Sequence, residues 1–293
     1  MEKIVIAGGT GFIGSYIHNR FKEMGYSVII ISRKPNNISW DQNDLINAFE
    51  GAEMIINLAG YPINCQHSEA VKVKILNSRT NSTFLIGKAI QACENPPKIW
   101  INTSATGIYK SSLTQPMNED ELDFGSDFLA KVVTQWEKVF FDFQFPDTRQ
   151  IALRTSVVLG EIGGALHPLV QLTRIGLGGK QGTGMQMFSW IHLEDYFRIL
   201  IFLLKTSTAE GVFNCTSPFP VTNKMFMKEL QRKLHVLYGI PAPKFLIEFA
   251  SKFICIEPGL ILNSSYVIPK KILEMGFQFK FPLIDGALSD LLE

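Results

Sequence analysis

The feature that most constrains the fold is a glycine-rich turn near the start of the chain, Gly8-Gly9-Thr10-Gly11-Phe12-Ile13-Gly14. An apolar run at residues 3–7 precedes this turn and a helical pattern at 12–24 follows it. The glycines permit a tight bend, bring backbone close to a pyrophosphate and let the helix pack on the strand. The N–H groups at the start of the helix then face the phosphates. A turn without ligand is the alternative. The pattern predicts a dinucleotide site with contacts from Gly8, Thr10, Gly11, Phe12, Ile13 and Gly14.

The rest of the first half alternates short apolar runs with longer helical patterns. Strands are predicted at 27–31, 53–57, 98–103 and 149–154, with helices at 44–49, 68–93 and 127–143. Such alternation indicates βαβ crossovers and a parallel sheet covered on both faces. The predicted fold class is therefore α/β, a doubly wound parallel Rossmann-type sheet with a smaller, mixed C-terminal substrate lobe.

The ends of the second and third predicted strands indicate which dinucleotide is bound. A site for NAD usually has an acidic residue after the second strand, about 20 residues past the glycines, but Ser32-Arg33-Lys34 occupy that place here. Arg33 can bind a 2′-phosphate through two parallel hydrogen bonds, with Ser32 and Lys34 beside it. After the third strand, Leu58 is followed by the small residues Ala59 and Gly60, and this segment would let the adenosine pass close to backbone. NADP(H) is therefore the predicted cofactor. A solvated basic loop and a simple turn are the alternatives for the two segments.

The domain boundary is predicted after residue 155, where the regular alternation of strands and helices ends. Residues 1–155 are expected to form the NADP-binding Rossmann domain, to which the chain returns near 190–216 with a helix at 193–205 and a strand at 211–215. Residues 156–293 are expected to form the substrate lobe. The glycine-rich segment 176–186 within it is expected to be a lid, and a second phosphate site is the less favoured alternative.

The overall composition argues against several classes of partner. Lys plus Arg number 28 and Asp plus Glu number 27, which gives a formal net charge of +1. Such a balance predicts no binding to nucleic acid or an anionic membrane. The four cysteines, Cys65, Cys93, Cys215 and Cys255, contain no C-x-x-C pair, so we expect no metal site, no disulfide framework and small buried thiols. The apolar run near 199–204 is too short to span a bilayer. A cytoplasmic monomer or homodimer acting on a small molecule is expected.

Several further segments, taken with the three already described, resemble a known family. They are 103–109 (TSATGIY), 136–137 (WE), 153–160 (LRTSVVLG), 189–192 (SWIH) and a tail from 267 to 279. Together they resemble the extended or atypical short-chain dehydrogenase/reductases of the NAD-dependent epimerase/dehydratase family. Within it, they resemble a subgroup of "epimerase family proteins" with a C-terminal domain of unknown function, which would lie at about 240–293.

The resemblance implies further cofactor contacts. It implies Ser32 and Arg33 at the 2′-phosphate and Leu58 and Ala59 on the adenosine side, and it adds Arg79, Thr103 and Val158. Lys74 departs from the family pattern, because some relatives have an acidic contact at its place.

The resemblance also implies a catalytic serine, tyrosine and lysine, of which only the serine is present. Ser104 matches it, whereas Leu129 and Val133 occupy the places of the Tyr-x-x-x-Lys pair. Neither apolar side chain can move a proton. Tyr109 could supply a phenol from another direction or pack at the mouth of the site.

Four other residues near the expected site are expected to have structural or solvent-exposed roles. Lys131 lies on the far face of its predicted helix and is expected to be solvated, and Asp127 is expected to cap that helix. His192 and Trp190 are expected to be structural.

Two functions therefore stay open. The first is an NADP-dependent oxidoreductase or epimerase that acts on a small carbonyl or sugar-like substrate. The second is a non-catalytic NADPH-binding sensor or a cell-division-associated interaction protein. An intact cofactor pattern without the usual proton donor is compatible with both.

Overall fold

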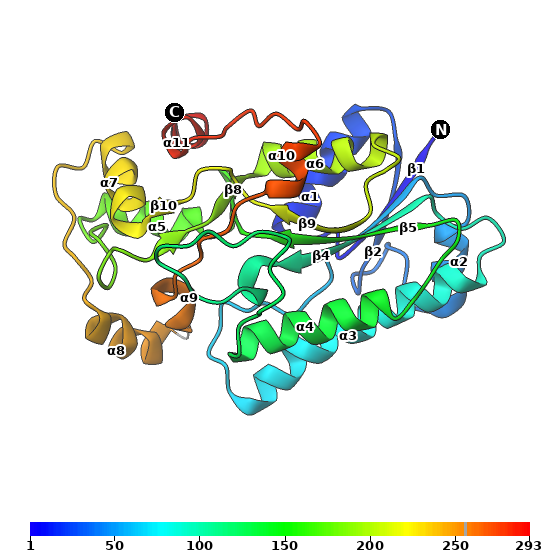
Figure 1. The fold of residues 1–293 in the computed structure, drawn as a ribbon, viewed down its shortest axis with the longest axis horizontal. Coiled ribbons are helices and arrows are strands. Elements are labelled where there is room, and N and C mark those ends of the chain that lie inside the picture. The colour runs from blue at the N-terminus through cyan, green and yellow to red at the C-terminus, as the bar shows by residue number, and fades with distance from the viewer. Residues whose placement is uncertain (255–256) are drawn as a thin grey trace.

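A six-stranded parallel sheet forms the centre of the molecule in the computed structural model, which describes residues 1–254 and 257–293. Its strand order is β2-β1-β3-β4-β5-β9 (Figure 1). The strands are β1 (Lys3–Ala7), β2 (Ser27–Ile31), β3 (Met54–Asn57), β4 (Ile99–Ala105), β5 (Arg149–Thr155) and β9 (Gly211–Cys215). Because every strand runs in the same direction, their carboxyl ends meet at one edge of the sheet. The predicted fold class is confirmed.

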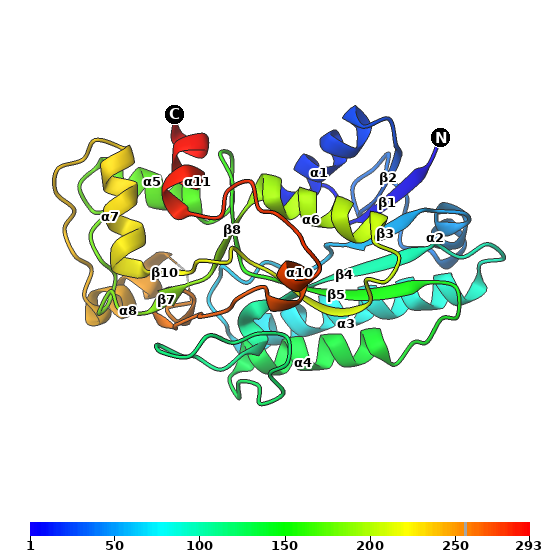
Figure 2. The ribbon, with the colours of Figure 1, turned by 45° about the horizontal axis from the view of Figure 1, so that its top comes forward.

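Helices cover both faces of this sheet. The first face carries α1 (Phe12–Glu23) and α6 (Leu193–Lys205), and the second carries α2 (Gln42–Phe49), α3 (Glu69–Ala92) and α4 (Phe128–Phe141) (Figure 2). Side chains alternate along each strand, so that Ile99 and Ile101 of β4 face α1 and α6 while Trp100 faces the other helices. All three are fully buried. This burial on both sides explains why β1 and part of every other strand are continuous apolar runs.

The second lobe packs beyond the carboxyl ends of the strands (Figure 1). Two pairs of short strands and several helices build it: β6 (Val157–Leu159), β8 (Trp190–His192), β7 (Met187–Phe188), β10 (Val221–Thr222), α5 (Leu166–Arg174), α7 (Asn223–Lys233), α8 (Lys244–Ile254), α9 (Gly259–Leu262) and α11 (Ile284–Leu292). Its core joins α5, α7 and α11 through residues such as Val170, Phe226 and Leu288. The short helix α10 (Lys270–Glu274) returns to the sheet beside β9 (Figure 1), where its Ile272 is buried in the same core as α1 and α6. None of the helices in the described parts of the chain is long and apolar enough to span a membrane.

Several predicted boundaries needed correction by a few residues. The helix expected at 127–143 is α4 and ends at Phe141, and the strand expected at 98–103 is β4 and continues to Ala105. No helix was predicted between residues 160 and 176, yet α5 forms there. Its buried residues Leu166 and Val170 are one helical turn apart, and they anchor it to the lobe.

Candidate functional site

The glycine turn between β1 and α1 fits the geometry required to bind a dinucleotide. Gly8 has a positive φ of 78°, and a Cβ there would lie 2.8 Å from the backbone nitrogen of Ala59. A Cβ on Gly14 would lie 2.6 Å from the Cα of Gly9, so this glycine is what lets the helix sit close to the turn. Gly11 differs, because a Cβ there would meet only the carbonyl oxygen of Gly8, at 3.8 Å. The turn is therefore tight on two sides and open at the start of α1.

The amino end of α1 has no side-chain cap. Its N-cap residue is Gly11, and its first turn contains no acidic residue. Five other helices begin with a side chain that accepts a backbone N–H hydrogen bond; these caps are Asp41, Ser68, Asp127, His192 and Thr222. An uncapped amino end leaves N–H groups and the positive end of the helix dipole for an anion. A pyrophosphate fits this place.

The loop after β2 carries the predicted phosphate-binding residues. The Ser32 side chain is buried, and its Oγ accepts hydrogen bonds from Lys34 N at 3.0 Å and Asn37 Nδ2 at 2.8 Å. These bonds fold the loop so that Arg33 and Lys34 are exposed. Within residues 1–254 and 257–293, neither of these two side chains makes an ion pair. Ser32 therefore shapes the loop, and two cations remain available to a phosphate.

A half-buried arginine of α3, without a carboxylate partner in the described parts of the chain, lies beside the segment that follows β3. Arg79 of α3 donates hydrogen bonds to the carbonyl oxygens of Tyr61 and Ile75, both at 3.0 Å. Its guanidinium lies beside Gly60, where a Cβ would be 3.2 Å from Cζ, and 5.4 Å from the centre of the Trp136 ring. Burial lowers the pKa of Arg79 to about 10. Such a cation is suited to meet an anionic ligand at this edge of the sheet.

Two hydrogen bonds hold the backbone of Leu58 and Ala59 in place. Leu58 N donates to Ala7 O at 2.8 Å, which extends the pairing of β1 and β3, and Ala59 N donates to Asn57 Oδ1 at 3.1 Å. Lys74, on the same helix as Arg79, is exposed to solvent.

Ser104 belongs to a buried polar network at the end of β4. Its Oγ donates a hydrogen bond to Glu137 Oε1 at 2.6 Å. Arg154 of β5 binds the same carboxylate with two nitrogens, Nε to Oε1 at 2.9 Å and Nη2 to Oε2 at 2.7 Å. All three side chains are less than one-tenth exposed. The arginine stabilises the carboxylate, which in turn fixes the orientation of the serine.

Tyr109 closes the other side of this network. Its hydroxyl donates to Asn214 Oδ1 and accepts from Arg154 Nη1, both at 2.9 Å. Burial raises the pKa of Tyr109, and the nearby Arg154 cation only partly opposes that rise. Leu129 and Val133, at the places of the missing pair, lie in α4, and Val133 packs against Tyr109. The phenol is therefore held by packing and two hydrogen bonds.

Thr103 and Val158 face the α1–α6 side of the sheet. Thr103 Oγ1 lies 3.0 Å from the hydroxyl of Tyr196 in α6. Val158 in β6 is buried in the same core as Leu193. The structure thus separates these two residues from Ser104, whose side chain points to the opposite face.

The sequence analysis did not identify Glu137 and Arg154 as partners of Ser104. A signal was present, because Arg154 stands inside an apolar strand, and a buried cation requires a partner. Glu137 falls four residues after the buried Val133, on the same face of α4. Pairing them requires knowing that this helix face lies over β5.

The cap expected at Asp127 and the solvent exposure expected of Lys131 are confirmed, and His192 and Trp190 make structural contacts. Asp127 caps α4 by accepting from Ala130 N at 3.0 Å, and Lys131 is exposed. His192 caps α6, with Nδ1 accepting from Glu194 N at 3.1 Å, and Trp190 is fully buried. Among the cysteines, Cys215 is buried as expected, Cys65 and Cys93 are half-buried, and Cys255 lies outside the described residues.

The segment expected to form a lid is instead bonded to distant backbone. Gly179 N donates to Ile240 O at 3.1 Å and Gly182 N to Ala242 O at 2.8 Å, while Ala242 N donates back to Lys180 O at 2.9 Å. Because these bonds run along the segment as in a sheet, they anchor it to the lobe.

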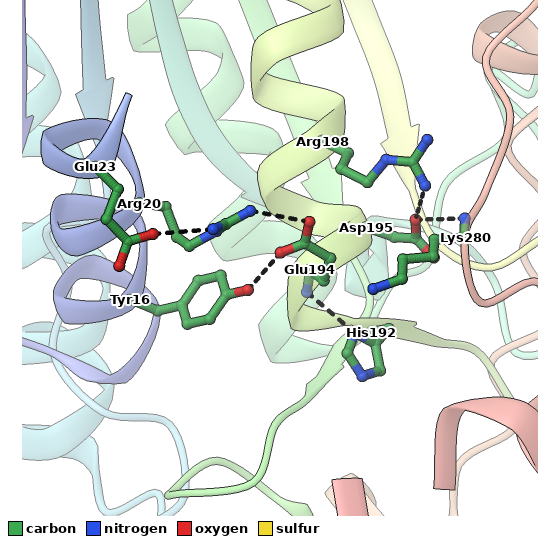
Figure 3. A network of polar contacts seen from close by, with 8 residues as sticks. All are labelled: Tyr16, Arg20, Glu23, His192, Glu194, Asp195, Arg198 and Lys280. Carbon is green, nitrogen blue, oxygen red and sulfur yellow. Dashed lines mark hydrogen bonds and ion pairs between the residues drawn. The ribbon is translucent and has the colours of Figure 1, made fainter. Parts of the chain in front are cut away.

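A cavity of about 830 Å³ runs from the amino end of α1, at Thr10, Gly11 and Phe12, along this helix to the start of α6 and the end of α11. Figure 3 shows the polar network that lines it: Glu194 accepts from the Tyr16 hydroxyl at 2.6 Å and from Arg20 at 3.2 Å. Beside it, the buried Asp195 carboxylate accepts from Lys280 N and Phe281 N, both at 2.8 Å. Neither Ser104 nor Tyr109 lines this cavity. The Glu194 contacts join α1 to α6, and the Asp195 contacts attach the C-terminal segment to α6.

Comparison with known proteins finds two sequence families along the chain. The pattern of the NAD dependent epimerase/dehydratase family matches residues 4–216, and a domain of unknown function, DUF1731, matches residues 242–291. The human epimerase family protein SDR39U1 is 33% identical over 298 residues and 99% of each chain. An epimerase family protein of Staphylococcus epidermidis is 31% identical over the whole of both chains. The resemblance inferred from the sequence motifs is confirmed.

Solved structures agree with these matches. The crystal structure of human SDR39U1 with NADPH covers 99% of both chains with a TM-score of 0.91 at 32% identity. The UDP-N-acetylglucosamine 4-epimerase of Bacillus cereus shares the fold, with a TM-score of 0.78 at 18% identity. The predicted cofactor therefore agrees with the one found in the human relative.

Proposed function

Because this chain belongs to the NAD dependent epimerase/dehydratase family, we propose that it binds NADPH and acts as an oxidoreductase or epimerase on a small carbonyl or sugar-like substrate. The observation that carries the cofactor assignment is the uncapped amino end of α1 together with Arg33 and Lys34, two exposed cations that form no ion pair among the residues the structure describes. The NADPH in the human relative supports the same assignment.

The residues present fit the parts of this cofactor. The open position at Gly11 receives the pyrophosphate, Arg33 and Lys34 receive the 2′-phosphate, and the backbone of Leu58 and Ala59 borders the adenosine. When bound, the nicotinamide ring supplies or accepts the hydride.

Ser104, together with Glu137, can accept the substrate proton or return it. The serine donates its own hydrogen to the carboxylate, so the lone pairs of Oγ remain free to accept a hydrogen bond from a substrate hydroxyl. In alcohol oxidation a proton would pass from the substrate to Oγ while the serine proton passes to Glu137, and reduction would reverse this movement. Serine and glutamate would thereby replace the missing tyrosine and lysine.

The cofactor assignment is tested by calorimetric titration of NADPH and NADH into wild type and Arg33→Ala. The substitution should weaken NADPH binding by about 1–3 kcal/mol, because a charge-assisted contact to the 2′-phosphate is lost. NADH binding should change little, and Arg33→Lys should lie between the two because it keeps the charge without the planar fork. Equal losses for both dinucleotides would show that Arg33 does not bind the extra phosphate.

The activity is tested by following NADPH absorbance with a panel of aldehydes, ketones and nucleotide sugars. Ser104→Ala should abolish the turnover seen with wild type. Ser82→Ala is a matched control, because Ser82 is also buried and donates a single hydrogen bond, to Arg79 O at 3.0 Å. Equal loss in both variants would assign the effect to folding.

One observation favours a second candidate function, a non-catalytic NADPH sensor. The hydroxyl groups of Ser104 and Tyr109 both donate their hydrogen bonds to other protein groups. The apolar Leu129 and Val133 occupy the places of the usual tyrosine and lysine. Tight NADPH binding without turnover across the panel would support this candidate and contradict the enzyme.

A further inference from the structure

The outer end of the C-terminal lobe exposes five apolar side chains on two neighbouring segments. They are Ile175 and Leu177 after α5, and Leu237, Tyr238 and Ile240 between α7 and α8; we call them the apolar tip. Backbone bonds join the segments, from Ile240 N to Gly176 O at 2.8 Å and from Gly179 N to Ile240 O at 3.1 Å. Figure 1 shows the connection between α7 and α8 at the left end of the molecule. The five side chains therefore belong to one surface.

These side chains protrude from the surface. Leu237 is 88% exposed and Tyr238 85%, with Ile175 at 71% and Ile240 at 63%. Exposure this high means that few neighbouring atoms contact the side chains, so they do not line a groove. Contiguous apolar surface of this kind commonly marks an interaction site on a soluble domain.

Basic residues surround the apolar tip. Arg174 adjoins Ile175 in the chain, Lys180 follows Gly179, and Lys224 lies near Lys180, since a Cβ on Gly184 would be 3.1 Å from the Cβ of each lysine. Arg174, Lys180 and Lys224 are exposed and make no ion pair within the described parts of the chain.

Further cations lie on α7 and α8, of which Arg232 and Lys233 are paired with Asp285 and Glu293 of the C-terminal segment. Residues 223–250 contain five Lys or Arg and two Glu. Of the glutamates, Glu229 is paired with Arg232 at 2.8 Å and Glu248 lies 3.7 Å from Lys244. The net charge of +1 predicted no membrane binding. That value is a sum over the whole chain and does not describe the local charge near the apolar tip.

We propose that the apolar tip docks the protein onto the surface of an anionic phospholipid bilayer. Protruding aliphatic side chains can enter the acyl boundary one by one, and a tyrosine is suited to the headgroup level. The surrounding lysines and arginine are attracted by the lipid phosphates. Helix α8 extends the surface with Phe245, 71% exposed, and Leu246, 44% exposed. A protein partner would need a deep complementary recess to cover Leu237 and Tyr238, whereas lipid needs none.

The test is sedimentation of the full chain with vesicles of phosphatidylcholine, with or without phosphatidylglycerol. Wild type should bind only the anionic vesicles, and binding should weaken at high salt because of the electrostatic contribution. Leu237→Asp should reduce the partition coefficient by about tenfold or more, since it removes an aliphatic side chain that would enter the acyl boundary and adds a negative charge. Tyr238→Trp should retain binding and show fluorescence quenching by brominated lipids.

Leu122→Asp is the matched control, because Leu122 is 83% exposed but lies on the loop between β4 and α4, outside the apolar tip. It should bind vesicles like wild type. Absence of wild-type binding to anionic vesicles, or equal losses in the Leu237 and Leu122 variants, would overturn the proposal. Self-association in sedimentation velocity that Leu237→Asp abolishes, without vesicle binding, would instead assign the tip to a contact between two copies. Because no readout involves NADPH, these outcomes are independent of the proposed function.

Discussion

The glycine turn and the Ser104 network lie at the same edge of the sheet but are built in opposite ways. The turn leads into a helix without a side-chain cap, beside cations that pair with no carboxylate in the described chain. Around Ser104, by contrast, Glu137, Arg154 and Tyr109 all bond to one another or to a neighbouring buried group. The first region keeps its hydrogen-bonding capacity for a ligand, and the second uses it within the protein.

This difference predicts which property a substitution changes. Buried ion pairs contribute little net stability, but removing one partner leaves an uncompensated charge in the interior. Exposed cations such as Arg33 contribute little to folding and much to the recognition of an anion. Substitutions in the network should therefore act on the free energy of unfolding, and substitutions in the turn on cofactor affinity.

The largest effect is expected for Glu137→Ala. The substitution leaves the Arg154 guanidinium, which is 3% exposed, without the carboxylate that binds it. The free energy of unfolding should fall by about 3–5 kcal/mol. Urea denaturation followed by circular dichroism measures this change.

Two controls separate the buried charge from loss of packing. Glu137→Met combined with Arg154→Met should recover part of the loss, because no unpaired charge remains. Glu53→Ala removes a carboxylate paired with the 70% exposed Lys98 and should cost less than about 1 kcal/mol. A loss in Glu53→Ala as large as that in Glu137→Ala would contradict the distinction between buried and exposed pairs.

Local patterns were sufficient to predict the framework of the Rossmann domain. The strand at 27–31 and the helix at 193–205 match β2 and α6 at both ends. A continuous run of β-branched residues defines the first and helical periodicity defines the second, so both can be recognised without knowledge of distant contacts. The cap at Asp127 was predictable for the same reason, because its acceptor and donor are three residues apart.

Contacts between distant segments could not be predicted in this way. Glu137 lies 33 residues from Ser104, and Asp195 binds backbone N–H groups at 280 and 281. The glycine-rich segment 176–186 has the composition of a mobile loop, but its backbone pairs with residues 240–242. The composition of a segment indicates how many backbone conformations it can adopt in isolation. Whether it is mobile in the folded protein depends on its hydrogen bonds to distant residues.

The second prediction compares the capped helix α6 with the uncapped α1. Burial lowers the pKa of His192, the α6 cap, to about 4, and the Asp290 carboxylate only partly opposes this. An unfolded histidine has a pKa near 6.5, so between these values the unfolded chain binds a proton that the folded chain does not. The stabilisation present above pH 6.5 should therefore be lost as the pH falls toward 4, by up to about 3 kcal/mol.

His192→Asn provides the control for this titration. Asparagine retains an acceptor for the Glu194 N–H group but does not titrate. Urea unfolding at a series of pH values should give a shallower decline below pH 6.5 for the variant than for wild type. Parallel curves for the two proteins would show that His192 does not cause the decline.

The smallest effect on stability, and the sharpest division between folding and binding, is expected within the glycine turn itself. Gly14→Ala places a Cβ 2.6 Å from the backbone of Gly9 and should cost about 1–3 kcal/mol of unfolding free energy as well as NADPH affinity. Gly11→Ala meets only Gly8 O at 3.8 Å and should cost less than about 1 kcal/mol. Its methyl group nevertheless enters the space assigned to the pyrophosphate. Calorimetry should therefore find much weaker NADPH binding to a Gly11→Ala protein that still unfolds near the wild-type urea midpoint. Unchanged affinity would mean that the phosphates bind elsewhere.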